Sequence, residues 1–329
     1  MRHRMTEKDA IMISTVLGAV VLTFVLVLCR PFSWGSDTEV AVSGGSANAS
    51  QVAVSGGTIF GGTVSGGVIG AGGGEIINEE GMTLETRVNP PAGFQRVKVG
   101  RNSFGSFLRG YKLKKAGAKV KLYNGKNKQN QDAHAAVFKL PIEKEDLQQC
   151  ADSVIRMYAE YFWETEQYDN ISFQFADGFQ ADYIKWRQGY RIRVAQSTSW
   201  ISGGGYDASY ENFKKYLRMV FAYSSTLSQE RESKKIRLSA ARAGDIFIQG
   251  GSPGHVVMIV DVCEDAAGKK AFLLAQGYMP AQQFQLLKNP AHEQDGDPWY
   301  YEDEIRYPLQ TPEYDFKKGS LKRPEYLSE

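Results

Sequence analysis

The stretch that decides the expected fold is Gly244-Asp245-Ile246-Phe247-Ile248, then Gly250-Gly251-Ser252-Pro253-Gly254, then His255-Val256-Val257-Met258-Ile259-Val260-Asp261-Val262. The two apolar runs predict buried strands, and the glycine and proline residues between them predict a tight turn. After a polar loop, residues 271–275 predict a third strand that delivers Gln276. A histidine at the mouth of one strand, with an amide on its neighbour, is a common way to orient an imidazole base. An ordinary β-meander whose turn contains His255 is the alternative.

Elimination among the few histidines and cysteines narrows the candidate chemistry. The histidines are His3, His134, His255 and His292. The first precedes an apolar segment and the last lies in a polar, proline-flanked stretch, which leaves His134 and His255 as bases for chemistry near neutral pH. The cysteines are Cys29, Cys150 and Cys263, without a CxxC pair or a Cys/His cluster. We therefore expect no structural zinc site and no other cofactor.

The composition predicts one globular domain behind a long N-terminal extension. The 329 residues are 42% hydrophobic and 23% charged, which is enough to bury a core, although the first eighty residues or so contribute little to it. The formal net charge of +2 produces no large field, so we expect no nucleic-acid partner.

Residues 10–29 form an uncharged apolar run long enough to span a bilayer as a helix. Arg2, Arg4 and Lys8 precede the run, and after Arg30 no Lys or Arg occurs before Arg87. This asymmetry predicts a cytoplasmic N-terminus at 1–9 and a body outside the cytoplasmic membrane, in the periplasm. We expect an uncleaved single-pass anchor, with lipidation at Cys29 as the alternative.

Between the anchor and the domain lies a segment of low complexity. Residues 35–74 are mostly Gly, Ser, Val, Ala and Thr, and Val-Ser-Gly-Gly recurs at 42–45, 54–57 and 64–67. This composition predicts a flexible linker over 30–84, followed by a globular domain over 85–329.

Residues 143–164 carry the clearest helical periodicity in the chain, and Cys150 falls on its apolar face. Near the N-terminal end of a helix, the helix dipole lowers the pKa of a thiol and favours the thiolate. A packed core cysteine is the alternative, because free cysteine behaves as a small hydrophobic residue. A second long helix is expected over 210–230.

Four further residues are candidates for substrate binding. Asp132 and His134 lie in a polar loop between two expected strands, and they are also the catalytic pair of an alternative enzyme. Trp186 lies on an expected short helix over 179–188, and Tyr278 follows the strand that ends at Gln276. For the loop residues, turn chemistry alone is the alternative.

Five segments resemble a bacterial envelope family known only as a domain of unknown function, DUF 4846. These are Asn130-Gln131-Asp132-Ala133-His134, Asp146-Leu147-Gln148-Gln149-Cys150-Ala151-Asp152, Ala181-Asp182-Tyr183-Ile184-Lys185-Trp186-Arg187, Gly244-Asp245-Ile246-Phe247-Ile248-Gln249-Gly250-Gly251 and Leu274-Ala275-Gln276-Gly277-Tyr278-Met279-Pro280-Ala281-Gln282. The resemblance covers about 88–316 and implies no activity.

A second, more distant resemblance suggests an enzymatic activity. The Gly-Asp-apolar strand, the turn and the Gly-His-apolar strand are similar to the second half of NlpC-type and CHAP-type papain-like cell-wall peptidases. In those families a cysteine at a helix N-terminus precedes the hairpin and a polar residue follows it. Cys150, His255 and Gln276 occur in the same order in this chain. The gap between Cys150 and His255 is longer here, Cys150 lies deeper in its expected helix, and Gln276 lies further past the histidine.

These observations lead to one expected fold and one leading function. The fold is α+β, a papain-like antiparallel sheet with two main helices. The resemblance implies a membrane-anchored cysteine hydrolase that cleaves cell-wall peptides, with Cys150 as nucleophile, His255 as base and Gln276 as orienting residue. We expect Cys150 and Cys263 to be unpaired. The alternatives are an inactive envelope-binding module, an enzyme that uses His134 with Asp132, and a purely structural envelope protein.

Overall fold

The computed structural model describes residues 75–327. The expected anchor over 10–29, the lipidation site Cys29 and most of the expected linker lie outside the described residues. Within 75–327, no helix is both long and apolar enough to cross a bilayer. The globular unit begins earlier than residue 85, because Ile77 bridges to Val88 and the Leu84 side chain is fully buried.

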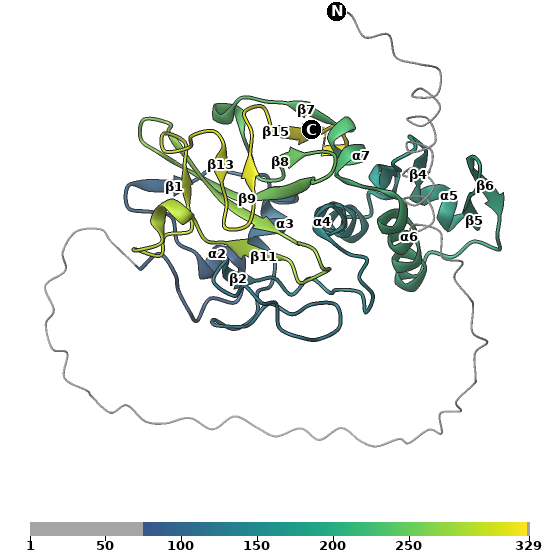
Figure 1. The fold of residues 1–329 in the computed structure, drawn as a ribbon, viewed down its shortest axis with the longest axis horizontal. Helices are drawn as coiled ribbons and strands as arrows, with labels where there is room; N and C mark the ends of the chain where they lie inside the picture. Colours follow the sequence, from purple (N-terminus) through teal and green to yellow (C-terminus); the bar gives the residue numbers. More distant parts are fainter. Residues whose placement is uncertain (1–74, 328–329) are drawn as a thin grey trace, which may run out of the picture. The chain divides into compact units, whose positions relative to one another are not determined.

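An antiparallel sheet of nine strands forms the centre of the unit (Figure 1). Its main path runs β2-β11-β10-β9-β8-β15-β7, while β1 pairs with β9 and β12 pairs with β10. The strands are β1 Phe94–Arg96, β2 His134–Val137, β7 Ser233–Lys235, β8 Ile246–Gln249, β9 His255–Asp265, β10 Lys270–Gln276, β11 Gln285–Leu287, β12 Tyr300–Tyr301 and β15 Leu321–Pro324. The α+β class and the antiparallel pairing expected from the sequence are confirmed.

The central hairpin is confirmed almost residue by residue. His255 is the first residue of β9 and pairs with Gln249 of β8, while β10 ends at Gln276. The sequence specifies this hairpin locally, because apolar β-branched runs are bounded by a turn that only small residues fit. A Cβ on Gly254 would lie 2.4 Å from Thr226 Oγ1 and 2.5 Å from Gly251 O, so the turn requires glycine there.

Strand β9 contributes to apolar cores on both of its faces. Val256, Met258 and Val260 belong to one buried cluster, and Val257 and Ile259 belong to another. This alternation follows the two-residue period of a strand. The first cluster includes the apolar face of α4 Cys150–Glu164, which contacts β9 and β10. The helix therefore covers one face of the sheet at the strands that carry His255 and Gln276.

The described residues contain six α-helices, and three of the expected helices differ from the sequence prediction. They are α2 Leu84–Arg87, α3 Phe104–Gly110, α4 Cys150–Glu164, α5 Tyr183–Arg187, α6 Tyr210–Tyr223 and α7 Thr226–Arg231. The helix expected over 143–164 begins only at Cys150. The helix expected over 210–230 is divided into α6 and α7, because Ser225 begins a new helix with a capping box to Ser228.

The remaining elements form smaller hairpins. They are β3 Ser172–Gln174 with β4 Gln180–Asp182, β5 Tyr190–Val194 with β6 Thr198–Ser202, and β13 Leu309–Gln310 with β14 Asp315–Phe316. Figure 1 shows α5, α6 and the β5–β6 hairpin together on the side of α4 remote from the sheet. The segment expected as a short helix over 179–188 is β4 followed by α5.

Candidate functional site

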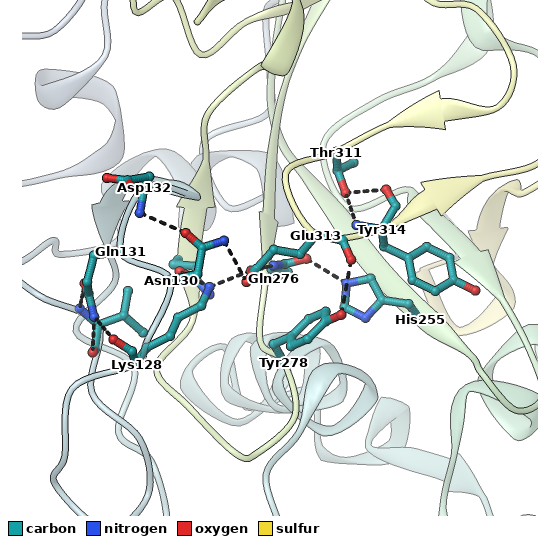
Figure 2. A network of polar contacts seen from close by, with 12 residues as sticks. Lys128, Asn130, Gln131, Asp132, His255, Gln276, Tyr278, Thr311, Glu313 and Tyr314 are labelled. Carbon is teal, nitrogen blue, oxygen red and sulfur yellow. Dashed lines mark hydrogen bonds and ion pairs between the residues drawn. The ribbon is translucent and has the colours of Figure 1, made fainter.

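The candidate site is centred on His255, whose side chain is held by Gln276 at the end of the neighbouring strand. His255 Nε2 lies 2.6 Å from Gln276 Oε1 (Figure 2). Both side chains are buried, at 2% and 0% exposure. The pairing of β10 with β9 brings the two residues together, as the sequence predicts, although they are 21 positions apart.

A chain of polar contacts fixes which way the Gln276 amide faces. Gln276 Nε2 donates to Glu313 Oε2 at 2.8 Å, and Glu313 Oε2 lies 2.5 Å from Lys128 Nζ. The amide oxygen therefore faces the imidazole and accepts its proton, so the hydrogen of neutral His255 is on Nε2. Nδ1 accepts no hydrogen bond from any described residue, and its lone pair is available as a base.

Three aromatic rings surround the imidazole. The ring centroids of Tyr278, Tyr314 and Phe316 lie 4.9, 5.0 and 5.9 Å from that of His255. This environment disfavours a charged imidazole. Burial lowers the pKa of His255 to about 4, Gln276 opposes that shift and the positive charge of Lys128 adds to it. His255 is therefore neutral near pH 7.

Cys150 is the first residue of α4, a correction to the expectation that it lies deeper in the helix. The helix begins here because the Asp152 carboxylate accepts the Gln149 N–H at 3.0 Å, which caps the first turn.

The thiol of Cys150 lies beside the His255–Val256 peptide. The backbone N–H groups of Ala151, Val256 and Cys150 itself interact favourably with the sulfur. A negative charge on the sulfur would raise the pKa of Tyr278 and of Tyr314, so both tyrosines lie near it. Both of those rings touch His255. Cysteine, histidine and glutamine from three distant segments are thus gathered in one place.

The pKa of Cys150 differs from the sequence prediction. Burial, aided by the negative charge of Asp152, raises it to about 11, against the opposing effect of the backbone N–H groups. The expected lowering by the helix dipole is therefore wrong for this conformation, since the thiol is only 7% exposed and its desolvation dominates. At neutral pH the thiol and the imidazole are both uncharged.

Gly277 allows the end of β10 to approach the first turn of α4. A Cβ at this position would lie 2.3 Å from Ser153 Oγ and 2.8 Å from Gln149 O, so no larger residue fits without displacement. Since Gly277 follows Gln276 directly, the end of β10 that carries Gln276 lies against the first turn of α4.

Of the other predicted site residues, Tyr278 contacts His255, whereas Asp132 and His134 have other partners. Asp132 is exposed, and its backbone N–H donates to Asn130, whose amide lies 3.4 Å from Glu313. His134 Nε2 lies 3.1 Å from the carbonyl oxygen of Ala118, and burial lowers the pKa of His134. The described contacts do not join Asp132 and His134 as an acid–base pair.

Trp186 belongs to a different part of the molecule. Its indole N–H donates to Asn212 Oδ1 at 2.9 Å, and its ring packs on Tyr216 of α6 and beneath Arg191 of β5. These contacts join α5 to α6 and do not bring Trp186 to the His255 cluster.

Sequence reasoning missed Glu313, Lys128 and Tyr314. Glu313 meets Gln276 across 37 positions and Lys128 across 185. No motif surrounds any of the three, so only folding reveals them. Cys150 and Cys263, the two cysteines within the described residues, are both free and buried. Among the described residues, no cluster of His, Cys, Asp and Glu has the arrangement of a metal site.

The fold and site thus define an α+β domain with a buried Cys-His-Gln cluster between a helix N-terminus and an antiparallel sheet. A family model described as domain of unknown function (4846) matches residues 84–323, and the chain belongs to this family. No protein with a curated description and no solved structure matches the chain.

Proposed function

We propose that the domain is a cysteine hydrolase with a papain-like arrangement of Cys150, His255 and Gln276. The observation that carries the proposal is the fixed Gln276 amide, which leaves His255 Nδ1 as a free acceptor while the Cys150 thiol lies beside the His255–Val256 peptide. A nucleophile, a base and an orienting group in this order are the parts that amide hydrolysis needs.

The proposed reaction begins with two neutral groups. As Cys150 Sγ attacks the carbonyl carbon of an amide, its proton passes to His255 Nδ1, and the carbonyl oxygen becomes an oxyanion. The backbone N–H groups of the first turn of α4 lack partners within the helix and supply donors for that charge. The carbon–nitrogen bond then breaks, and imidazolium returns the proton to the departing amine.

Hydrolysis of the thioester completes the cycle. Water adds to the acyl carbon while His255 Nδ1 takes one of its protons, and the sulfur then leaves and recovers a proton from the imidazolium. Gln276 keeps accepting the Nε2 proton throughout, so the imidazole holds one orientation through both halves.

We propose cell-wall peptides as the substrate, acted on outside the cytoplasmic membrane. The support is the resemblance of the hairpin to NlpC-type and CHAP-type peptidases, together with the expected anchor at 10–29 and the linker that follows it. A tethered enzyme would reach amide bonds in a polymer that lies beyond the bilayer.

An assay of peptidoglycan-peptide hydrolysis, in which the released amines are measured, tests the proposal. We expect Cys150→Ala to abolish turnover, His255→Ala to lower it about a hundredfold or more, and Gln276→Ala about tenfold, because an orienting group contributes less than a base. Cys263→Ala is the matched cysteine control and His134→Ala the matched histidine control, and both should keep full activity. Equal activity of Cys150→Ala and the unmodified protein would contradict the proposal.

A binding module without catalysis is the second candidate, and one observation favours it. The burial that raises the pKa of Cys150 to about 11 is also what a packed core cysteine shows. A module of this kind would bind cell-wall peptides equally well before and after Cys150→Ala and would release no amine from them.

A further inference from the structure

The turn at residues 311–314, called the covering turn below, lies over His255. It joins β13 to β14, which form a separate two-stranded sheet. Its last residue, Tyr314, has its ring against the imidazole, and Phe316, two residues on, has its ring against it too. Figure 2 shows Thr311, Glu313 and Tyr314 arranged around the His255 and Gln276 side chains.

Apolar side chains fix the two ends of this hairpin. Leu309 and Phe316 are buried in the second core cluster, and the Phe316 ring lies 6.1 Å from that of Phe247 on β8. Burial of large apolar side chains stabilises both positions. The ends of the hairpin are therefore part of the domain core.

Polar contacts hold the covering turn itself. Glu313 pairs with Lys128 and accepts from Gln276, and its backbone carbonyl lies 3.1 Å from the Tyr278 hydroxyl. The Tyr314 hydroxyl donates to Pro253 O at 3.1 Å, on the turn before His255. The net free energy of one such polar contact is smaller than that of burying a large apolar side chain, so the turn opens more easily than its apolar ends.

The closed arrangement is incompatible with substrate entry. Cys150, His255 and Gln276 are 7%, 2% and 0% exposed, and an attacking sulfur has to come within about 3.5 Å of the carbonyl carbon. An element over the site has to move. The covering turn is the candidate, because it touches His255 directly and is held by polar contacts between two fixed ends.

We propose that the covering turn is a lid on the Cys150–His255 site and that Glu313 holds it closed. Because Glu313 also fixes the Gln276 amide, closing the lid over a bound peptide would restore the orientation of the base. Glu313 is in this sense a positioning residue, which acts on His255 through Gln276. The chemistry assigned to the closed state rests on the proposed function, whereas the opening of the lid does not.

Alkylation of Cys150 in the folded full-length chain measures the opening without any assay of catalysis. Iodoacetamide is applied at constant pH, and labelling at each cysteine is followed by peptide mass spectrometry. We expect slow labelling of the unmodified protein and about tenfold faster labelling of Cys150 in Glu313→Gln, the change that loss of one charged hydrogen bond produces. Lys128→Met removes the same ion pair from the other side and should act alike.

Two controls separate local opening from damage to the fold. Asp315→Asn changes an exposed carboxylate on the same hairpin and should leave the labelling of Cys150 unchanged. Cys263, fully buried in β9, should stay protected in every variant. An unchanged Cys150 rate in both Glu313→Gln and Lys128→Met overturns the lid, as does a parallel rise in the labelling of Cys263.

The lid and the hydrolase fail in different ways. Faster labelling of Cys150 without any peptide hydrolysis would keep the lid and reject the enzyme. Peptide hydrolysis with unaltered labelling of Cys150 would support the enzyme and reject the lid. If both hold, Glu313→Gln labels faster but hydrolyses more slowly, because its opened site has lost the orientation of the base.

Discussion

Strand β9 carries two buried polar centres that differ in how fully their groups are paired. Asp261 is fully buried, and its carboxylate lies 2.7 Å from both Arg96 Nε and Arg109 Nε. It also accepts the Val262 N–H at 2.9 Å. His255, six residues earlier, has one hydrogen bond at Nε2 and an open acceptor at Nδ1.

This difference separates a structural centre from the proposed functional one. Every oxygen of Asp261 has a donor, so the group joins β1 and α3 to the sheet and has no capacity left for chemistry. His255 keeps an open acceptor at Nδ1 under the covering turn, and the Cys150 thiol lies beside the His255–Val256 peptide. A titratable group whose pKa is strongly shifted by burial and that keeps an open acceptor is a candidate for a functional site.

The largest expected effect comes from breaking the paired centre. Asp261→Asn leaves Arg96 and Arg109 without their counter-charge, which should lower the free energy of unfolding by about 3–5 kcal/mol. Urea unfolding measures this change. Glu264→Gln, a half-buried position on the same strand, is the matched control and should change little. A loss below about 1 kcal/mol for Asp261→Asn would show that the pairing is dispensable.

The next effect concerns His255 and depends on pH. Unfolded His255 binds a proton below its ordinary pKa near 6.5, whereas the folded residue does so only below about 4. Stability is therefore fully present above pH 6.5 and is lost as the pH falls through this window. The unmodified protein should lose about 3 kcal/mol relative to His255→Gln between pH 7 and pH 4.

Chemical unfolding of both proteins at several pH values gives this difference directly. Subtracting the variant removes the contributions of other groups, such as Asp152, whose pKa burial raises to about 8. Parallel stability curves for the two proteins would mean that His255 titrates normally in the folded state and is not desolvated.

The smallest effect tests whether Trp186 belongs to the site. Trp186→Phe keeps a ring between α5 and α6 but loses the hydrogen bond to Asn212, at a cost of about 1 kcal/mol. Because this contact is remote from β9, the alkylation rate of Cys150 and the affinity for cell-wall peptides should not change. Weaker peptide binding at unchanged stability would restore Trp186 as a substrate-binding residue.

The sequence determined the elements whose signals are local. Strands β8, β9 and β10 follow from apolar runs around a turn that needs Gly254, and the alternation along β9 fills a core on each face. The meeting of His255 and Gln276 also follows from the pairing of β9 with β10.

Tertiary contacts decided what local signals could not. Residues 143–149 have the composition of a helix, yet Arg218 of α6 binds Glu143 and Glu145 at 3.0 and 2.9 Å, and Arg156 binds Gln148 at 2.7 Å. These contacts hold residues 143–149 in a non-helical conformation, and the helix starts at Cys150. Helix propensity is worth only tenths of a kcal/mol per residue, so such contacts override it.

The protonation state of the site was likewise beyond the sequence. The helix dipole suggested a thiolate, but the burial of Cys150 makes desolvation the larger effect. Glu313 and Lys128, which fix the Gln276 amide, come from segments without any motif. The sequence alone suggests the candidate reactive groups, whereas their pairing and burial depend on distant segments that meet only in the folded protein.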